Sequence, residues 1–160
     1  MSEIPLTFDE RGLITVHAAI AVPVHQVYGN VLFYIDTGST HVVLSYATCE
    51  KLKIDQSKFP ERKAGLGFGG RFHTRCAEEA LLFFRDREGK PVSEIPVREI
   101  RLILDLPRPV GIKGRQARTD KTTIQLLKSS PSVIGTSFFK ENNAVLHLNW
   151  EKRCGYLRIP

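Results

Sequence analysis

Short apolar segments separated by turns are the feature of this sequence that most constrains its fold. They are rich in Val, Ile, Leu and Phe, and they end at Gly, Pro or charged turns such as 9–12 and 86–90. The segments are 13–22, 30–35, 41–44, 80–84, 97–104 and 144–148. Helical spacing is confined to three short stretches, which are 45–52 with Ser45 as N-cap, 122–128 and 137–142. The pattern predicts an all-β protein with one or two short helices.

The length of 160 residues predicts one domain, residues 1–160, with a core of its own. No apolar stretch approaches the ~20 residues of a membrane helix, so we expect no membrane span. The acidic start, Met1 to Pro5, leads into no apolar segment, and we therefore predict a cytoplasmic protein. The three cysteines are widely spaced without a C-x-x-C pair, which favours free thiols over disulfides or zinc.

The segment 33–40 (FYIDTGST) carries the clearest chemical signal, because an apolar strand leads directly into Asp36. Gly38 allows a tight turn behind the carboxylate, and the hydroxyl groups of Thr37 and Ser39 can supply hydrogen bonds that orient it. A tripeptide of this kind also occurs in ordinary Asx turns after strands. The motif therefore gains meaning only from its context.

That context resembles the retropepsin-like aspartic proteases. In this family an apolar strand, the motif Asp-Thr/Ser-Gly-Ser/Ala and a further apolar stretch are followed much later by an apolar-apolar-Gly element. Here the first half is 33–39 followed by 42–44, and the second is 133–135 followed by Phe138 and Phe139. The resemblance covers roughly residues 13–156 and implies an acid-protease barrel in which Ile134 and Gly135 pack beneath Asp36. It also implies hydrolysis of peptide or protein substrates by an aspartic endopeptidase without a cofactor.

A Gly-rich segment at 63–75 (KAGLGFGGRFHTR) fits the tip of a hairpin. By its position it resembles the family's flap, with Gly67, Phe68, Gly69 and Gly70 at the tip. A flap of this kind closes over the substrate. The same segment contains a G-x-G-x-x-G pattern, but the strand and helix that a dinucleotide site needs are not evident around it.

The sequence departs from some viral members, which pair an Arg after the second Gly with an Asp after the first motif. Thr136 and Thr40 stand at those places here. The distance from Asp36 to Ile134 along the chain is also greater, and the basic loop 105–121 accounts for the extra length. Both departures bear on dimer strength and on the shape of the substrate site more than on the fold.

A single Asp-Thr-Gly motif implies a homodimer. Hydrolysis by this chemistry needs two carboxylates, one to take a proton from water and one to donate a proton to the carbonyl oxygen. The chain has one such motif and about half the length of a two-lobed enzyme. A twofold dimer would bring the two copies of Asp36 together. The strand-like ends, 4–8 and 155–159, would pair between chains, as recurs in the family, or within one chain.

Other chemistries receive little support from the sequence. The five histidines show no metal-binding spacing, and neither Ser39, Ser45 nor Cys49 lies in a nucleophile motif, so we predict no metal and a water nucleophile. The net charge of +6 lies mostly in 106–128, but the aromatic residues are too scattered for a nucleic-acid platform. A non-catalytic dimeric peptide-binding module on the same fold is the alternative to a protease.

Overall fold

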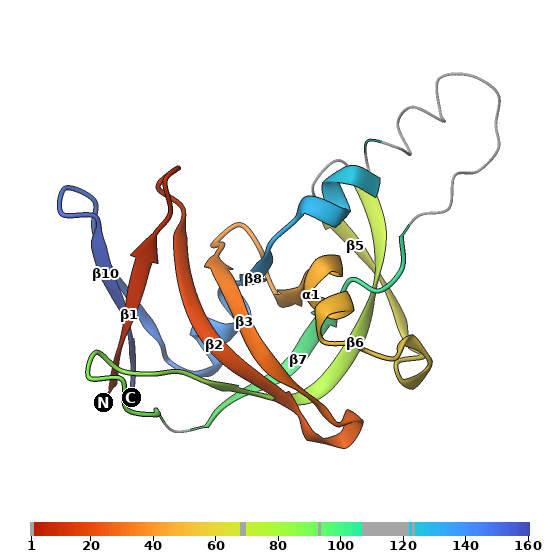
Figure 1. Cartoon of the computed structure of the whole chain (residues 1–160), viewed down its shortest axis with the longest axis horizontal. Helices are drawn as coiled ribbons and strands as arrows, with labels where there is room; N and C mark the ends of the chain where they lie inside the picture. Colours follow the sequence, from red (N-terminus) through yellow and green to blue (C-terminus); the bar gives the residue numbers. More distant parts are fainter. Residues whose placement is uncertain (1, 68–69, 93, 107–121, 123) are drawn as a thin grey trace.

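The computed structural model describes residues 2–67, 70–92, 94–106, 122 and 124–160 (Figure 1). Its strands are β1 (Ser2–Phe8), β2 (Ile14–Val22), β3 (Val27–Ile35), β4 (Val42–Leu44), β5 (Arg62–Gly67), β6 (Gly70–Phe83), β7 (Ile95–Leu102), β8 (Ser132–Ile134), β9 (Val145–Asn149) and β10 (Cys154–Ile159). The helices are α1 (Tyr46–Lys51), α3 (Thr136–Glu141) and the short 3-10 turns η1 (Pro23–His25) and η2 (Gln56–Lys58), and residues 124–129 are also helical. The expected all-β class is confirmed.

Six strands close into a barrel in the order β6, β7, β4, β8, β3 and β2. The ring closes where residues 19–21 of β2 pair with 81–83 of β6. Two of its pairs are parallel, β3 with β8 and β4 with β7. Since parallel neighbours need a long connection, segments distant in sequence lie side by side here. The parallel pairs thus bring the residues after β3 next to those after β8.

The barrel interior is filled by the alternate residues of its strands. In β2 these are Val16, Ala18 and Ile20, all buried, while His17 between them points outward and is exposed. The largest fully buried side chains include Phe33, Phe84 and Phe138, and the last two meet edge to face with ring centroids 5.9 Å apart. Helix α3 is thereby fixed against the barrel.

Helix α1 begins as its sequence predicts. The Ser45 hydroxyl accepts a hydrogen bond from the Thr48 amide at 3.2 Å, and it also contacts the Thr48 hydroxyl at 3.0 Å. Ser132 of β8 joins this buried group, because its hydroxyl receives the Ser45 amide at 3.0 Å. The helix is therefore tied directly to the strand that precedes Gly135.

The two ends of the chain pair with each other. Strand β1 is antiparallel to β10 from Ser2↔Ile159 to Leu6↔Gly155, and β9 then pairs with the other edge of β10 (Figure 1). Of the two arrangements considered from the sequence, pairing between chains is not the one seen; the ends 4–8 and 155–159 pair within one chain. The reason is that the β9–β10 hairpin folds back and presents β10 to β1.

The Gly-rich segment forms a hairpin of β5 and β6, with backbone pairing from Arg62↔Arg75 to Gly67↔Gly70. It is longer than the predicted range 63–75, since β6 continues to Phe83 and joins the barrel. The tip residues Phe68 and Gly69, and residues 107–121 of the basic loop, lie outside the described residues. No helix in the described part of the chain is long and apolar enough to cross a membrane.

Candidate active site

Asp36 is the first residue after β3, at the point where the parallel pair of β3 and β8 ends. The register of this pair finishes at Ile35↔Ile134, and the Asp36 amide then donates to the Ile134 carbonyl at 3.1 Å. Ile134 itself is fully buried. The backbone of Asp36 is thus anchored in the barrel, while its half-buried side chain belongs to the loop that follows.

The loop 36–40 turns tightly around the carboxylate. The Gly38 amide donates to Asp36 Oδ1 at 2.9 Å, and the Ser39 amide donates to the Asp36 carbonyl at 3.0 Å. A Cβ atom at Gly38 would lie 3.1 Å from Asp36 Oδ1, closer than almost all real Cβ contacts. A residue without a side chain therefore suits this position.

An Asx turn of this kind is not by itself a sign of catalysis. Asp55 accepts the Ser57 amide at 2.9 Å and Asp86 accepts the Glu88 amide at 2.9 Å in the same way, in exposed turns. What distinguishes Asp36 is the second backbone element that packs against its loop.

That second element is Gly135 and the start of α3. A Cβ atom at Gly135 would lie 2.5 Å from both the Ser39 and the His41 carbonyl oxygens, so the two backbones approach as closely as only glycine allows. The Thr136 amide and hydroxyl both donate to the Ser39 carbonyl, at 2.9 and 3.2 Å, and the Ser137 amide donates to the Thr40 carbonyl at 2.8 Å. Backbone and hydroxyl contacts therefore hold the loop against the start of α3.

The structure brings together Asp36, Gly38, Ser39, Ile134 and Gly135 of the predicted site residues. The Ser39 hydroxyl donates to the His41 carbonyl at 3.2 Å, so it supports the loop backbone rather than the carboxylate. Thr37 is exposed at the top of the turn. Gly67 and Gly70 form the last pair of the hairpin, whereas the predicted tip residues Phe68 and Gly69 are outside the described residues.

The Asp36 carboxylate differs from those of Asp105 and Glu99 in its partners. Asp105 and Glu99 each receive cationic side chains, at 3.0 Å from Arg75 and 2.6 Å from Arg101. Within the described ranges no cation forms an ion pair with Asp36. The Asp36 carboxylate is therefore not engaged in a salt bridge that stabilises the fold, and it remains available for proton transfer.

A charged cluster beside the loop was missed in the sequence. Glu99 on β7 receives Lys63 of β5 at 2.7 Å and Arg101 at 2.6 Å, and the side chain of His41 lies among them. Burial and the Arg101 guanidinium lower the pKa of His41, although Glu99 acts in the opposite direction. Burial alone would raise the pKa of Glu99, but the hydrogen bond from Lys63 and the charge of Arg101 lower it. The period-two alternation of 97–104 could have predicted that Glu99 and Arg101 lie on one face of a strand. It could not have predicted that Lys63 of β5 lies opposite them.

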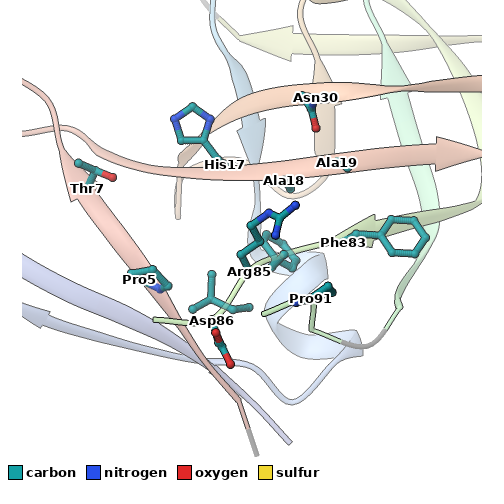
Figure 2. A pocket seen from close by; sticks show the side chains of 12 residues that line it. Pro5, Thr7, His17, Ala18, Ala19, Asn30, Phe83, Arg85, Asp86 and Pro91 are labelled. Carbon is teal, nitrogen blue, oxygen red and sulfur yellow. The ribbon is translucent and has the colours of Figure 1, made fainter. Parts of the chain in front are cut away.

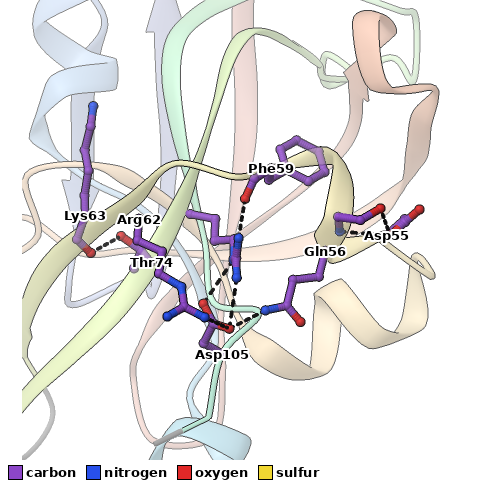
Figure 3. A network of polar contacts seen from close by, with 9 residues as sticks. Asp55, Gln56, Phe59, Arg62, Lys63, Thr74 and Asp105 are labelled. Carbon is purple, nitrogen blue, oxygen red and sulfur yellow. Dashed lines mark hydrogen bonds and ion pairs between the residues drawn. The ribbon is translucent and has the colours of Figure 1, made fainter.

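The base of the β5–β6 hairpin is held by a second polar network (Figure 3). The buried Arg75 donates to Asp105 at 3.0 Å and to the Phe59 carbonyl at 2.7 Å, and Arg62 reaches the same carboxylate at 3.3 Å. Gln56 also donates to Asp105. Burial would raise the pKa of Asp105, but the hydrogen bond and charge of Arg75 lower it. The network ties the segment after α1 to the hairpin and to the end of β7.

A hollow of about 350 Å³ lies elsewhere, between β1, β2 and the turn after β6 (Figure 2). Its lining comprises Ile4, Pro5, Thr7, His17, Ala18, Ala19, Asn30, Phe83, Phe84, Arg85, Asp86 and Pro91. None of these belongs to the Asp36 loop. Arg85 is already bonded to the Gly89 carbonyl at 2.8 Å, and Asp86 caps its own turn, so the charged groups here serve local structure.

The same architecture occurs in a solved structure. This chain is similar to the crystal structure of a retropepsin-like aspartic protease from Rickettsia conorii, with a TM-score of 0.50 over 98% of each chain. The fold is retropepsin-like. The two sequences are 16% identical, so the likeness concerns the fold alone. No model of a known protein family matches this sequence, and no curated protein matches it either.

Proposed function

We propose that this chain, acting as one domain of 160 residues, is a homodimeric aspartic endopeptidase in which the Asp36 carboxylates of two copies activate a water molecule. The observation that carries the proposal is the anchoring of Asp36. Its loop is fixed between the end of β3 and Gly135, in a retropepsin-like fold, with no structural cation on the carboxylate among the described residues. The substrate class is an extended peptide or protein segment.

The chemistry follows from placing two carboxylates together. Like charges about 3 Å apart cannot both ionise cheaply, so the pair holds one proton and titrates as a unit. The ionised carboxylate takes a proton from water as the water oxygen bonds to the peptide carbon. The protonated carboxylate donates its proton to the carbonyl oxygen. The tetrahedral intermediate then breaks its C–N bond as the nitrogen takes the proton that the first carboxylate had removed from water, while one hydroxyl of the intermediate returns a proton to the second carboxylate. Two peptide ends are released, and the pair again holds one proton.

The remaining predicted site residues receive roles consistent with their contacts. Gly38 and Ser39 hold the turn, and Thr37 lies at its exposed top. Ile134 and Gly135 support the loop from beneath. The hairpin of β5 and β6, whose last described pair is Gly67 with Gly70, acts as the flap and closes over the bound peptide.

Cleavage mapping with matched variants tests the proposal. Wild-type protein, Asp36→Asn and Asp86→Asn are incubated with a complex peptide library from acidic to neutral pH, and the cut sites are identified by mass spectrometry. Asp86 is the matched control because it forms the same Asx turn on an exposed loop. We expect the wild type and Asp86→Asn to cut identical sites and Asp36→Asn to cut none while it stays folded.

Two results would overturn the proposal. Cleavage by Asp36→Asn at the wild-type rate would show that another group is the catalyst. Peptide retention without cleavage by a dimeric wild-type protein would favour the non-catalytic binding module instead.

A further inference from the structure

Arg101 on β7 has a guanidinium group whose hydrogen-bond donors are mostly unused. The side chain is only 13% exposed. Among the described residues its one hydrogen bond runs from Nη1 to the Thr74 hydroxyl, at a long 3.5 Å. Its Nε lies 2.6 Å from Glu99 Oε1, but its N–H does not point at that oxygen and has no other acceptor in the described part of the chain. Buried donors are nearly always satisfied in folded proteins, so Arg101 has the capacity to bind a further acceptor.

Arg101 lies on the face of the sheet that leads to Asp36. One row of directly paired residues crosses β3, β8, β4 and β7, and it consists of Tyr34, Val133, Val43 and Arg101. Residues paired in this way point to the same side of a sheet. The other side is the barrel interior, which is filled by the fully buried neighbours of this row, Phe33, Val42 and Ile100. Asp36 is two positions beyond Tyr34, so strand alternation assigns it to the same face as Arg101.

The distance between the two groups corresponds to a short stretch of extended peptide. Strands β8 and β4 lie between β3 and β7, so Arg101 is three inter-strand steps from the strand of Asp36. At ~4.8 Å per step this is about 14 Å, which an extended chain covers in about four residues at ~3.3 Å each. The hairpin strand β5 reaches the same place, because Lys63 contacts Glu99 at 2.7 Å. A peptide held between the hairpin and Asp36 therefore passes Arg101 about four residues from the bond that is cut.

The carboxylates near Arg101 do not offer an equivalent site for a cation. Both oxygens of Glu99 contact cations, Oε2 with Lys63 and Oε1 with Arg101. Glu61 contacts Lys63 at 3.4 Å and its side chain is 59% exposed. Glu78 is exposed on β6 opposite Glu99, so it is one strand further from Asp36 than Arg101 is.

The last acid of this neighbourhood is Glu141 of α3, which accepts the Arg98 amide at 3.4 Å. The group with unused capacity is thus the Arg101 guanidinium, and its chemical complement is a carboxylate.

We propose that Arg101 is a specificity-determining residue that binds an Asp or Glu side chain of the substrate, about four residues from the cleaved bond. The proposal rests on the proposed function and adds an acidic residue to its substrate class. A planar guanidinium can hold a carboxylate through two parallel hydrogen bonds. In a twofold dimer one Arg101 lies on each side of the paired Asp36 carboxylates, so the preference applies both before and after the bond. Glu99 is a positioning residue, because it contacts Arg101 rather than the substrate.

Paired peptides test this preference. Peptides from sites cut by the wild type are synthesised with Glu or Gln at single positions roughly three to five residues from the bond. We expect the wild type to cleave the best Glu peptide with a kcat/KM about tenfold above that of its Gln partner. Arg101→Met should bring this ratio close to one. Arg98→Met is the matched control, since Arg98 is exposed on the same strand, and it should keep the wild-type ratio.

The ratio compares two peptides with one protein, so a general loss of activity in Arg101→Met cancels. If Arg101→Met does not fold, the wild-type ratios decide. A ratio close to one at every position, or a preference for Gln, overturns the role of Arg101.

Peptide retention separates this proposal from the proposed function. Immobilised Asp36→Asn, and the double variant Asp36→Asn with Arg101→Met, are exposed to the same peptide library, and retained peptides are identified by mass spectrometry. We expect the first protein to enrich acidic peptides and the second to lose that enrichment. This result supports acid recognition even if the wild type cuts nothing, in which case only the proposed function fails. Equal enrichment of acidic peptides by both proteins overturns the role of Arg101 while Asp36-dependent cleavage still stands.

Discussion

The amide of Asp36 donates to the carbonyl of Ile134 at 3.1 Å, joining the end of β3 to the strand that precedes Gly135. This one bond places the loop 36–40 directly over Gly135. From there the Ser39 carbonyl accepts two hydrogen bonds from Thr136. The position of the candidate catalytic carboxylate is therefore set by backbone contacts between segments that are far apart in sequence.

Replacing Gly135 with Ala should disrupt this junction. The new methyl group would lie 2.5 Å from two backbone carbonyl oxygens, so the loop or α3 must shift. We expect the free energy of unfolding to fall by about 2–3 kcal/mol. Gly12→Ala is the control, since its Cβ would meet open space and only its φ of +81° is unfavourable, at about 1 kcal/mol. Chemical denaturation measures both, and equal losses would contradict the close approach.

Arg75 and Arg62 bind the same carboxylate but should differ in their contribution to stability. The Arg75 side chain is 10% exposed, whereas that of Arg62 is 55% exposed. Arg75 also donates a hydrogen bond to the Phe59 carbonyl. Arg75→Met removes the least exposed cation that binds Asp105 and leaves the Phe59 carbonyl without its side-chain donor, so we expect a loss of about 3 kcal/mol. Arg62→Met should cost under about 1 kcal/mol. Urea unfolding of the two variants checks the difference, and a similar loss in both would refute this account of the network.

His41 should make stability depend on pH near neutrality. Its pKa in the folded protein is lowered from the ordinary value of 6.5 by burial and by Arg101, while Glu99 opposes this and Lys63 and Glu141 act weakly. The unfolded chain therefore binds the proton first, and stability is lost as the pH falls through and below about 6.5. His41→Gln should lose this dependence. Glu99 and Asp105, whose folded pKa values are lowered, lose their contribution only at more acidic pH.

The measurement for His41 is the unfolding free energy of the wild type and His41→Gln at a series of pH values. The wild-type curve should decline relative to the variant on acidification below about 6.5. Parallel curves would show that His41 titrates alike in the folded and unfolded states.

Cys154 and Cys49 should react in a fixed order with thiol reagents. Cys154 is exposed, whereas Cys49 is buried and burial raises its pKa to about 12. Thiolate is the reactive form, so Cys154 should be modified first and Cys49 only on unfolding. Mass spectrometry after brief alkylation identifies the sites, and early labelling of Cys49 would contradict its burial.

Local patterns were sufficient to predict much of this fold. The apolar segment 13–22 became β2 and the Ser45 N-cap begins α1, because period-two alternation and a hydroxyl at an N-cap act within a few residues. The Asp-Thr-Gly and Val-Ile-Gly segments were recognised by resemblance to a family. Their contact is observed in the structure, but their catalytic role remains a prediction.

Long-range relationships could not be obtained in the same way. Nothing local in 4–8 or 155–159 determines whether these strands pair within a chain or between chains, since both arrangements satisfy the same hydrogen bonds. The cluster of Lys63, Glu99 and His41 requires three strands to be placed first. Such pairings depend on topology rather than on propensity.

The central claim is that two copies of Asp36 form one site, and a mixing experiment tests it most directly. Increasing amounts of Asp36→Asn are added to a fixed amount of wild-type protein at concentrations where subunits exchange, and the initial rate of peptide cleavage is followed. Mixed dimers hold one aspartate, so the rate should fall toward zero as they replace wild-type dimers. A wild-type rate that is unaffected by excess Asp36→Asn would show that each chain carries a complete site, and would contradict the account.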